Sequence, residues 1–423
     1  MAYASATGRS GLTFRISSER VDFLIFALWC LVTFVQFRGD ELVLYPLALY
    51  YAYSIWRYQR QIVPLLARAW VILLYPTWCL ISVLWAVEPI EALKHAVYLF
   101  LTMLICFQVV SRLSPREILH AICLAAIIVG AINFAVAMSS GRTTSGIFTS
   151  KNSMGKNMVV LWIATFATFL DPGTRWHFRL VALGFAILAA VMAVLSNSAT
   201  AVLLVLASAL IIAAGAVILR GGLFRASRLA TLCMVLAGMA TLALAILPYQ
   251  QVDPVNAILS QFGKDSTLTG RTLLWQYAEE QIRERPFLGV GAGGFWRYAE
   301  SPLVQRIHFE FYKGPYDRFN FHNSFYEIAV HQGLIGVALA SLGTLWAAVM
   351  IVRWAIREGT IPAIYFFAHG MVVLVRIATE ADFLKPFVLF HMIFWIGALA
   401  AVKHAAERDG QSLSFVWSRP RPS

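Results

Sequence analysis

Long apolar runs dominate the chain, and they restrict its fold more than any other feature. Hydrophobic residues make up 59% of the 423 positions and charged residues only 13%, and the mean hydropathy is +0.69. A soluble domain of ordinary composition is about half apolar and about a quarter charged. An apolar stretch of about 20 residues can cross a hydrocarbon core as a helix. The sequence therefore predicts an all-α, polytopic transmembrane helical bundle.

About twelve runs have the length of a membrane span. The first run follows a basic segment and lacks a small-residue cleavage site, so we interpret it as a retained span rather than a signal peptide. The expected spans are residues 21–37, 41–56, 63–86, 93–111, 118–138, 154–170, 180–196, 199–219, 229–248, 325–352, 361–379 and 384–402.

The long polar stretch between the ninth and tenth spans divides the chain. We expect an N-terminal transmembrane bundle of about nine spans over residues 1–248 and an external catalytic loop over 249–324. The C-terminal transmembrane spans then cover 325–402, and a cytoplasmic tail covers 403–423.

The distribution of basic residues predicts the orientation. If the N-terminus lies inside, every inner segment carries at least two arginines or lysines, as the positive-inside rule requires. Both termini are therefore predicted to be cytoplasmic. Because the net charge of +12 is largely explained by topology, it gives no support for nucleic-acid binding, and we expect no nucleic-acid partner.

The cysteines and histidines give no sign of a metal site. All five cysteines, Cys30, Cys79, Cys106, Cys123 and Cys233, fall inside apolar runs, so no disulfide framework or thiolate site is indicated. The chain has no His-Glu-x-x-His motif. We therefore expect no protein-bound catalytic metal and no cofactor.

The short loop before residue 157 departs from the charge rule. It is predicted to be external, yet it carries Arg142, Lys151 and Lys156 and no acid. Asn152 or Ser153 is a plausible N-cap for the span that follows. Free backbone N–H groups beside Lys151 would form an anion site, with Lys156 facing away. The alternative is that these cations only meet lipid headgroups.

The polar loop begins with a predicted amphipathic helix. Leu274, Ala278 and Ile282 recur at helical spacing between Arg271 and Arg285, and Trp275 flanks the apolar stripe. This helix should lie on the outer membrane face or on the bundle. Arg271 in its first turn is either a functional cation or an ordinary interfacial arginine, because its position opposes the helix dipole.

Two further groups of residues suit a glycan substrate, although each has a structural alternative. Nine aromatic residues between positions 295 and 321 could contact sugar rings or form a membrane-interface belt. Arg376, near the outer end of its span, either contacts substrate or forms a structural ion pair with Glu380.

Ordered motifs then indicate a family. The chain resembles the bacterial O-antigen ligase and polysaccharide polymerase superfamily, and within it most closely the exopolysaccharide polymerases. The motifs occur in family order, and they are Trp85-Ala86-Val87-Glu88-Pro89, Gly146-Ile147-Phe148-Thr149-Ser150-Lys151-Asn152, Thr269-Gly270-Arg271-Thr272 with Trp275, Pro286-Phe287-Leu288-Gly289-Val290-Gly291, and His322-Asn323 leading to Gly333-Leu334-Ile335-Gly336.

The resemblance implies a metal-independent, inverting glycosyltransferase in the bacterial inner membrane. Such enzymes transfer a glycan from undecaprenyl diphosphate to an acceptor sugar at the outer face. Carried over by motif, Arg271 matches the family's loop arginine and His322 its histidine, and we expect these two to be catalytic. The residues expected to bind substrate are Lys151, Asn152, Arg142, Asn323, Arg376 and Trp275.

One departure from the family pattern concerns the second cation of the diphosphate clamp. The family often has Ser-Arg or Ser-Lys at the start of a span where this chain has Ser198-Ala199. We expect Lys151, Arg142 or Arg376 to replace the missing cation, with Lys151 favoured. The alternative is a weakened or inactive member that acts as a scaffold.

The expected partners follow from this interpretation. They are an undecaprenyl-diphosphate-linked oligosaccharide, membrane lipid, and polysaccharide chain-length and export proteins. An O-antigen-type ligase that transfers polymer to a lipid or another acceptor is the first alternative. A lipid-linked glycan transporter is the second, although the sequence shows none of the repeated halves that are common in transporters.

Reporter fusions test the predicted topology. Because charge bias places residues 249–324 outside, fusions at Gln261 and Lys313 should show external activity, and fusions at Arg225 and Arg357 internal activity. The measurement is paired alkaline phosphatase and green fluorescent protein activity. A cytoplasmic signal from the long loop would contradict every functional expectation above.

Overall fold

The protein is a bundle of helices. The computed structural model describes residues 18–410 except positions 36, 38, 219–270 and 318, and no strand occurs among the described residues. The long helices are α1 (Ser18–Phe34), α2 (Glu41–Arg57), α5 (Pro89–Arg112), α6 (Pro115–Ser139), α7 (Lys151–Leu170), α8 (Trp176–Leu195), α9 (Ala199–Ile218), α14 (Ser324–Glu358), α15 (Ile361–Thr379) and α16 (Leu389–Arg408).

The predicted polytopic membrane bundle is confirmed. Within the described residues, 8 helices are long and apolar enough to cross a membrane, or 9 if one bent pair counts as a span. Helices α1 and α2 coincide with two more predicted runs and have 17 residues each. The predicted span at 229–248 lies outside the described residues. The count of about twelve spans is therefore not confirmed.

The third predicted span, residues 63–86, is broken rather than continuous. Helix α3 (Gln59–Arg68) meets the next helical stretch, Trp70–Leu84, at 89°. That stretch consists of η1 (Trp70–Leu73), α4 (Leu74–Ile81) and η2 (Ser82–Leu84). The break falls at Ala69, whose φ of −119° and ψ of 22° are outside the helical region. Residues on the two sides of Ala69 therefore belong to differently oriented helices.

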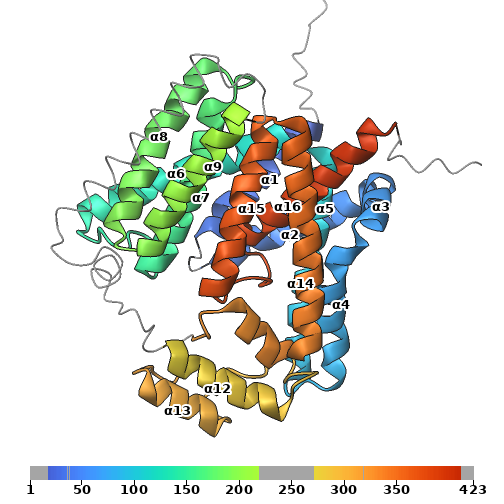
Figure 1. Ribbon diagram of the computed structural model, residues 1–423, viewed down its shortest axis with the longest axis vertical. Helices are drawn as coiled ribbons and strands as arrows, with labels where there is room; N and C mark the ends of the chain where they lie inside the picture. Colours follow the sequence, from blue (N-terminus) through green and yellow to red (C-terminus); the bar gives the residue numbers. More distant parts are fainter. Residues whose placement is uncertain (1–17, 36, 38, 219–270, 318, 411–423) are drawn as a thin grey trace, which may run out of the picture.

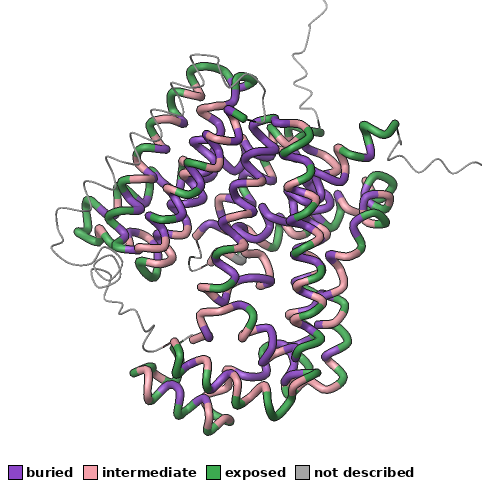
Figure 2. The backbone as a smooth tube through the Cα atoms, in the orientation of Figure 1, coloured by how far each residue is buried: buried purple, intermediate pink, exposed green. Residues whose placement is uncertain are grey.

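The buried core lies in the centre of the bundle. Figure 2 shows buried residues concentrated along α5, α7, α15 and α16, whereas α8 and the outer faces of other helices are largely exposed. The exposed outer faces carry many large apolar side chains, among them Leu49, Leu84, Ile187 and Leu345. In a bilayer these side chains would contact lipid, which is the expected arrangement for a membrane bundle.

A smaller layer lies below the bundle (Figure 1). We call residues 271–323 the loop layer; it contains α12 (Arg271–Glu284) and α13 (Pro302–Glu310). Helix α12 is the predicted amphipathic helix, and it packs on α14 with Leu274 and Ala278 buried. The loop layer has its own small core, formed by Leu274, Tyr277, Ala278, Val290, Phe295, Val304, Ile307 and Phe321 together with Val330 of α14.

Helix α13 was not predicted from the sequence. Its start is favoured by Ser301, whose hydroxyl accepts a hydrogen bond from the N–H of Val304, and by Pro302 at the first helical position. Val304 and Ile307 anchor it to the core of the loop layer. The aromatic stretch is therefore partly a packed helix rather than an open loop.

A kink in α14 connects the loop layer to the bundle. Gly333 has φ +66° and interrupts the helix, and the N–H of Leu334 donates to the carbonyl of Pro286 at 2.8 Å. A side chain at Gly333 would collide with the backbone of Phe287, so only glycine fits here. The N–H groups of Val290 and Gly291 also donate to α14 carbonyls. The glycines after Pro286 thus permit close backbone contact.

The same segment contacts a third family motif. The indole N–H of Trp85 donates to the carbonyl of Leu288 at 3.0 Å, and the N–H of Val87 donates to that of Val290 at 2.9 Å. A Cβ at Gly291 would meet Ala86. Three motifs that are far apart in the sequence therefore interlock and fix the loop layer on the bundle.

Candidate functional site

The candidate site is organised around the connection between α15 and α16. Two acids follow α15, Glu380 directly and Asp382 two residues later. Leu384 and Phe387, further along the connection, have φ of 57° and 58°, a region that side chains other than glycine rarely adopt. Such strained backbone is typical of functional segments that the surrounding structure holds in place.

Glu380 brings the two predicted catalytic residues together. Its Oε1 lies 3.9 Å from the guanidinium of Arg271, and its Oε2 lies 3.4 Å from Nδ1 of His322. Arg271 also donates to the carbonyl of Thr379, the last residue of α15, at 3.1 Å. One partly buried carboxylate therefore links α12, α14 and α15 at the predicted site.

The backbone around His322 is closely controlled. His322 has φ 51°, and its N–H donates to the side chain of Asn320 at 2.9 Å. The hydroxyl of Ser324 donates to the carbonyl of Glu380 at 2.6 Å. These contacts are made by the backbone of His322 and by Ser324, not by the imidazole ring, and they hold the ring beside Glu380.

Two of the predicted substrate-binding residues have structural contacts. The side chain of Asn323 is the N-cap of α14 and accepts from the N–H groups of Phe325 and Tyr326. Trp275 donates its indole N–H to the carbonyl of Phe321 at 2.9 Å and stacks on Tyr326. Both residues therefore position the segment that carries His322.

Asp382 gathers a second set of charged groups. Its Oδ2 lies 3.2 Å from Nζ of Lys156 and 3.4 Å from the guanidinium of Arg376, and its Oδ1 lies 3.6 Å from the ring of His391. The ion pair of Arg376 is therefore with Asp382 rather than Glu380. The expectation that Lys156 faces away is wrong, because position 156 lies on the side of α7 that faces the connection.

The electrostatics of the two acids follow from these contacts. Burial by itself raises the pKa of Glu380, but the hydrogen bond from His322 and the charges of Arg376 and Arg271 outweigh it and lower the pKa. Burial also raises the pKa of Asp382, but the charges of Lys156, His391 and Arg376 outweigh this effect. The pKa of Asp382 is therefore far below its usual value. Both groups are therefore carboxylates at neutral pH.

The remaining predicted residues lie at the N-terminus of α7 and in the loop before it. The N-cap is Ser150, which accepts from the N–H of Ser153, and not Asn152 or Ser153 as predicted. Lys151 and Arg142 are exposed. The side chain of Asn152 accepts from Ser198 at 3.5 Å, which places it beside Ala199, where the family often has a cation.

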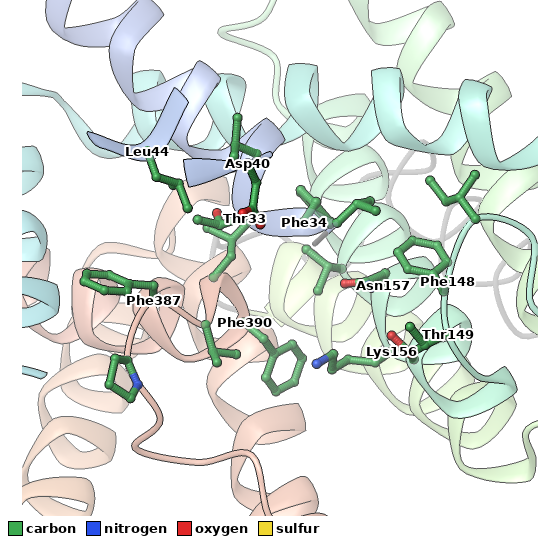
Figure 3. Close-up of a pocket in the computed structure, with 18 residues that line it drawn as sticks. Thr33, Phe34, Asp40, Leu44, Phe148, Thr149, Lys156, Asn157, Phe387 and Phe390 are labelled. Atoms are coloured by element: carbon green, nitrogen blue, oxygen red, sulfur yellow. The ribbon is translucent and has the colours of Figure 1, made fainter. Parts of the chain in front are cut away.

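A cavity of about 320 Å³ opens beside Lys156 (Figure 3). Figure 3 shows Lys156 reaching from α7 toward Phe390, with Phe387 on the opposite wall. Most of the lining residues are apolar, and the polar ones are Thr33, Asp40, Thr149, Ser153, Lys156 and Asn157. A cavity that combines apolar walls with polar groups suits a ligand that has a lipid part and a charged head.

No group of three or more His, Cys, Asp or Glu side chains is arranged to hold a metal in the part of the chain that the structure describes. The charged groups that do come together are mostly paired cations and carboxylates.

Comparison with known proteins gives one matching family model and one similar relative. Residues 184–341 match the family model described as O-antigen ligase. The predicted resemblance to the O-antigen ligase superfamily is confirmed. The exopolysaccharide production protein ExoQ of Rhizobium meliloti (strain 1021) is 32% identical over 276 residues, which is 64% of this chain and 61% of that protein. The chain thus covers less than two thirds of this relative's length, and what the similarity shows is a resemblance to an exopolysaccharide production protein.

Sequence reasoning did not assign Glu380 and Asp382 to the site. Glu380 was considered only as a structural ion-pair partner of Arg376. The position of the two acids directly after a span that contains Arg376 was the available signal, because acids are scarce in this chain and a buried arginine needs a partner. Lys156 was visible as a cation but was assigned to the wrong face of its helix.

The depressed pKa values predict a loss of stability in acid. A carboxyl group with a lowered folded pKa stabilises the fold above its usual pKa and loses that contribution as the pH falls toward the folded pKa. The usual values are 4.5 for Glu380 and 3.8 for Asp382. The thermal unfolding midpoint in detergent should therefore fall steadily below about pH 4.5.

Asp382→Asn isolates the larger part of this effect. It should lower the unfolding midpoint at pH 7, because it leaves the buried Arg376 without its carboxylate, at a cost of about 3 kcal/mol. It should also flatten the acid dependence. Asp409→Asn, at an exposed position, is the matched control and should match the wild type. An unchanged acid profile in Asp382→Asn would show that this ion cluster does not stabilise the fold.

Proposed function

We propose that this protein is a glycosyltransferase that polymerises undecaprenyl-diphosphate-linked repeat units into exopolysaccharide at the outer face of the bacterial inner membrane. The family match and the similarity to an exopolysaccharide production protein support the class of reaction. The observation that carries the proposal is the convergence of Arg271, His322, Arg376 and Lys156 on the two carboxylates of one connection.

The cations suit a diphosphate leaving group. Arg271, Arg376 and Lys156 carry three positive charges, and Glu380 and Asp382 carry two negative ones, so the cluster keeps an excess of positive charge. In a partly buried site, fixed cations stabilise developing phosphate charge more strongly than water does. The apolar walls of the adjoining cavity would hold the first part of the polyprenyl chain.

His322 and Glu380 suit the acceptor. A neutral imidazole has one unprotonated ring nitrogen, so His322 can accept the proton of an acceptor hydroxyl as a general base. Glu380 lies against Nδ1, so it would hold the ring in the tautomer that leaves Nε2 unprotonated and would stabilise the imidazolium once it forms.

The proposed transfer balances without a metal or a nucleotide. The acceptor oxygen forms a bond to the anomeric carbon of the donor glycan, and its proton passes to His322. The bond between that carbon and the diphosphate oxygen breaks, and the electron pair leaves with undecaprenyl diphosphate. Because attack and departure occur on opposite faces of the carbon, the anomeric configuration inverts.

The ligase is the second candidate. The matching family model is described as O-antigen ligase, and the same site chemistry would transfer a finished polymer to a lipid or another acceptor. The printed name of the relative, which concerns exopolysaccharide production, favours the polymerase for this chain. Chain-length and export proteins remain proposed partners of the polymerase.

Alanine substitutions test the two central residues. Arg271→Ala and His322→Ala should abolish polymer while leaving the amount of protein in the membrane intact. Arg271→Lys should retain only part of the activity, since an ammonium group lacks the planar fork that binds two phosphate oxygens. Arg283→Ala is the matched control, because Arg283 lies on the same helix but is exposed. Full polymer output from either alanine variant would remove that residue from the mechanism.

A second set of variants identifies the cation that replaces the family's basic residue at Ala199. The sequence favours Lys151, but Lys156 and Arg376 are the cations that lie near the carboxylates. We expect Lys156→Ala and Arg376→Gln to reduce polymer severely, by about tenfold or more for each lost charged contact. Lys151→Ala and Arg142→Ala measure the contribution of the exposed cations. Normal polymer in Lys156→Ala and Arg376→Gln, together with loss in Lys151→Ala, would return the role to Lys151.

A further inference from the structure

A second cavity lies on the other side of the connection between α15 and α16. Its volume is about 270 Å³, enough for about nine waters. Phe383, Leu384 and Lys385 form one wall, whereas Phe387 and Val388 line the cavity of Figure 3. Pro386 lines both cavities. The connection that carries Glu380 and Asp382 therefore separates two spaces of similar size.

The second cavity contains hydrogen-bonding groups that the protein does not use. His95 of α5 and Lys385 both line it, and neither makes a hydrogen bond to the part of the chain that the structure describes. At its base, Gln332 donates its amide N–H to Ser82 at 3.3 Å, while its amide oxygen is buried without a partner in the described structure. Buried polar groups are normally paired, so the free amide oxygen of Gln332, together with the half-buried His95 and Lys385 around the same cavity, indicates a polar ligand.

The walls of the cavity are aromatic and are tied to the backbone beside the catalytic histidine. The indole N–H of Trp296 donates to Oε1 of Glu327 at 3.0 Å. The other oxygen of Glu327 accepts from the N–H of Phe321 at 3.1 Å. A ligand that contacts Trp296 would thus be connected, through the carboxylate of Glu327, to Phe321, the residue before His322. Tyr75 adds a second aromatic ring to the lining.

We propose that this cavity binds the terminal sugar of the acceptor, with His95 and Lys385 contacting its hydroxyl groups and Trp296 supporting the ring. This inference rests on the proposed transferase function. The donor diphosphate would lie in the cavity beside Lys156 and the acceptor sugar in the cavity beside His95. Glu380, at the start of the connection between α15 and α16, would hold His322 for proton transfer from the acceptor.

The two cavities offer different groups to a ligand. The cavity beside Lys156 combines apolar walls with that cation and several polar side chains, which suits a lipid diphosphate. The cavity beside His95 is largely apolar, with aromatic rings and a few polar groups, which suits a sugar ring that packs on an aromatic side chain. A polymerase must bind one lipid-linked unit as donor and another as acceptor. Two different cavities would hold the anomeric carbon of the donor close to the hydroxyl of the acceptor.

A soluble acceptor tests the proposal, because it cannot act as a donor. The probe is the oligosaccharide released by mild acid from the lipid-linked repeat unit of the producing cells. The purified full-length protein is assayed in detergent with the lipid-linked unit as donor, and KM is measured for each substrate. His95→Phe keeps a ring of similar size, and Lys385→Met keeps the length of the side chain. Lys94→Met, an exposed position on the same helix as His95, is the matched control.

We expect His95→Phe and Lys385→Met each to raise the acceptor KM by about tenfold, as for the loss of one hydrogen bond, with the donor KM unchanged. Lys94→Met should match the wild type. An unchanged acceptor KM in both variants, or a rise in the donor KM instead, would overturn the proposal.

A binding measurement separates this proposal from the transferase function. If the wild-type protein lengthens no chain, the proposed function fails, and titration calorimetry with the same oligosaccharide then decides about the cavity. Binding to the wild type that weakens in His95→Phe would support a sugar site. Equal binding to both proteins, or none to either, would overturn it.

Discussion

The site depends on two carboxylates that stand directly after a transmembrane helix. Glu380 and Asp382 hold two histidines and three cations from α7, α12 and α15 in one place. Each cation would be costly in a partly buried position without a partner. Because the two acids lie within three residues of the end of α15, the position of that helix in the bundle fixes the position of the whole cluster. The loop layer is then joined to the bundle through charge as well as through packing.

A second constraint is close backbone contact, which fixes the position of the loop layer on the bundle. The segment after Pro286 packs against the kink at Gly333, and the same segment forms hydrogen bonds with residues 85–87. Glycine is required where the two backbones meet, because a Cβ at Gly333 would overlap Phe287. The motifs that indicate the family are therefore mainly those that fix the loop, and only His322 and Arg271 point directly to chemistry.

Much of the architecture could be predicted from the sequence, because span length and charge bias reflect simple properties of a bilayer. The amphipathic stripe of Leu274 and Ala278 likewise gave α12 before the structure did. The break at Ala69 could not be predicted, since its residues are apolar on both sides and hydropathy does not report direction. Helix α13 was hidden among aromatic residues, which suit several kinds of structure.

Only part of the site could be predicted from the sequence, because a sequence pattern does not report which helices pack together. A motif can identify Arg271 and His322, but the partner of a charged residue depends on how helices pack. Lys156 and Asp382 are 226 residues apart, and no local pattern connects them. Tertiary contacts thus supplied the two acids and Lys156.

The most direct test of the central claim is to identify the lipid-linked glycan that accumulates in cells lacking this protein. The polymerase account predicts undecaprenyl diphosphate carrying a single repeat unit, open to oxidation by membrane-impermeant periodate from the outer face of spheroplasts. Long polymer on the lipid would contradict it and indicate a ligase. Single units that are protected on the inner face would also contradict it and indicate a transporter.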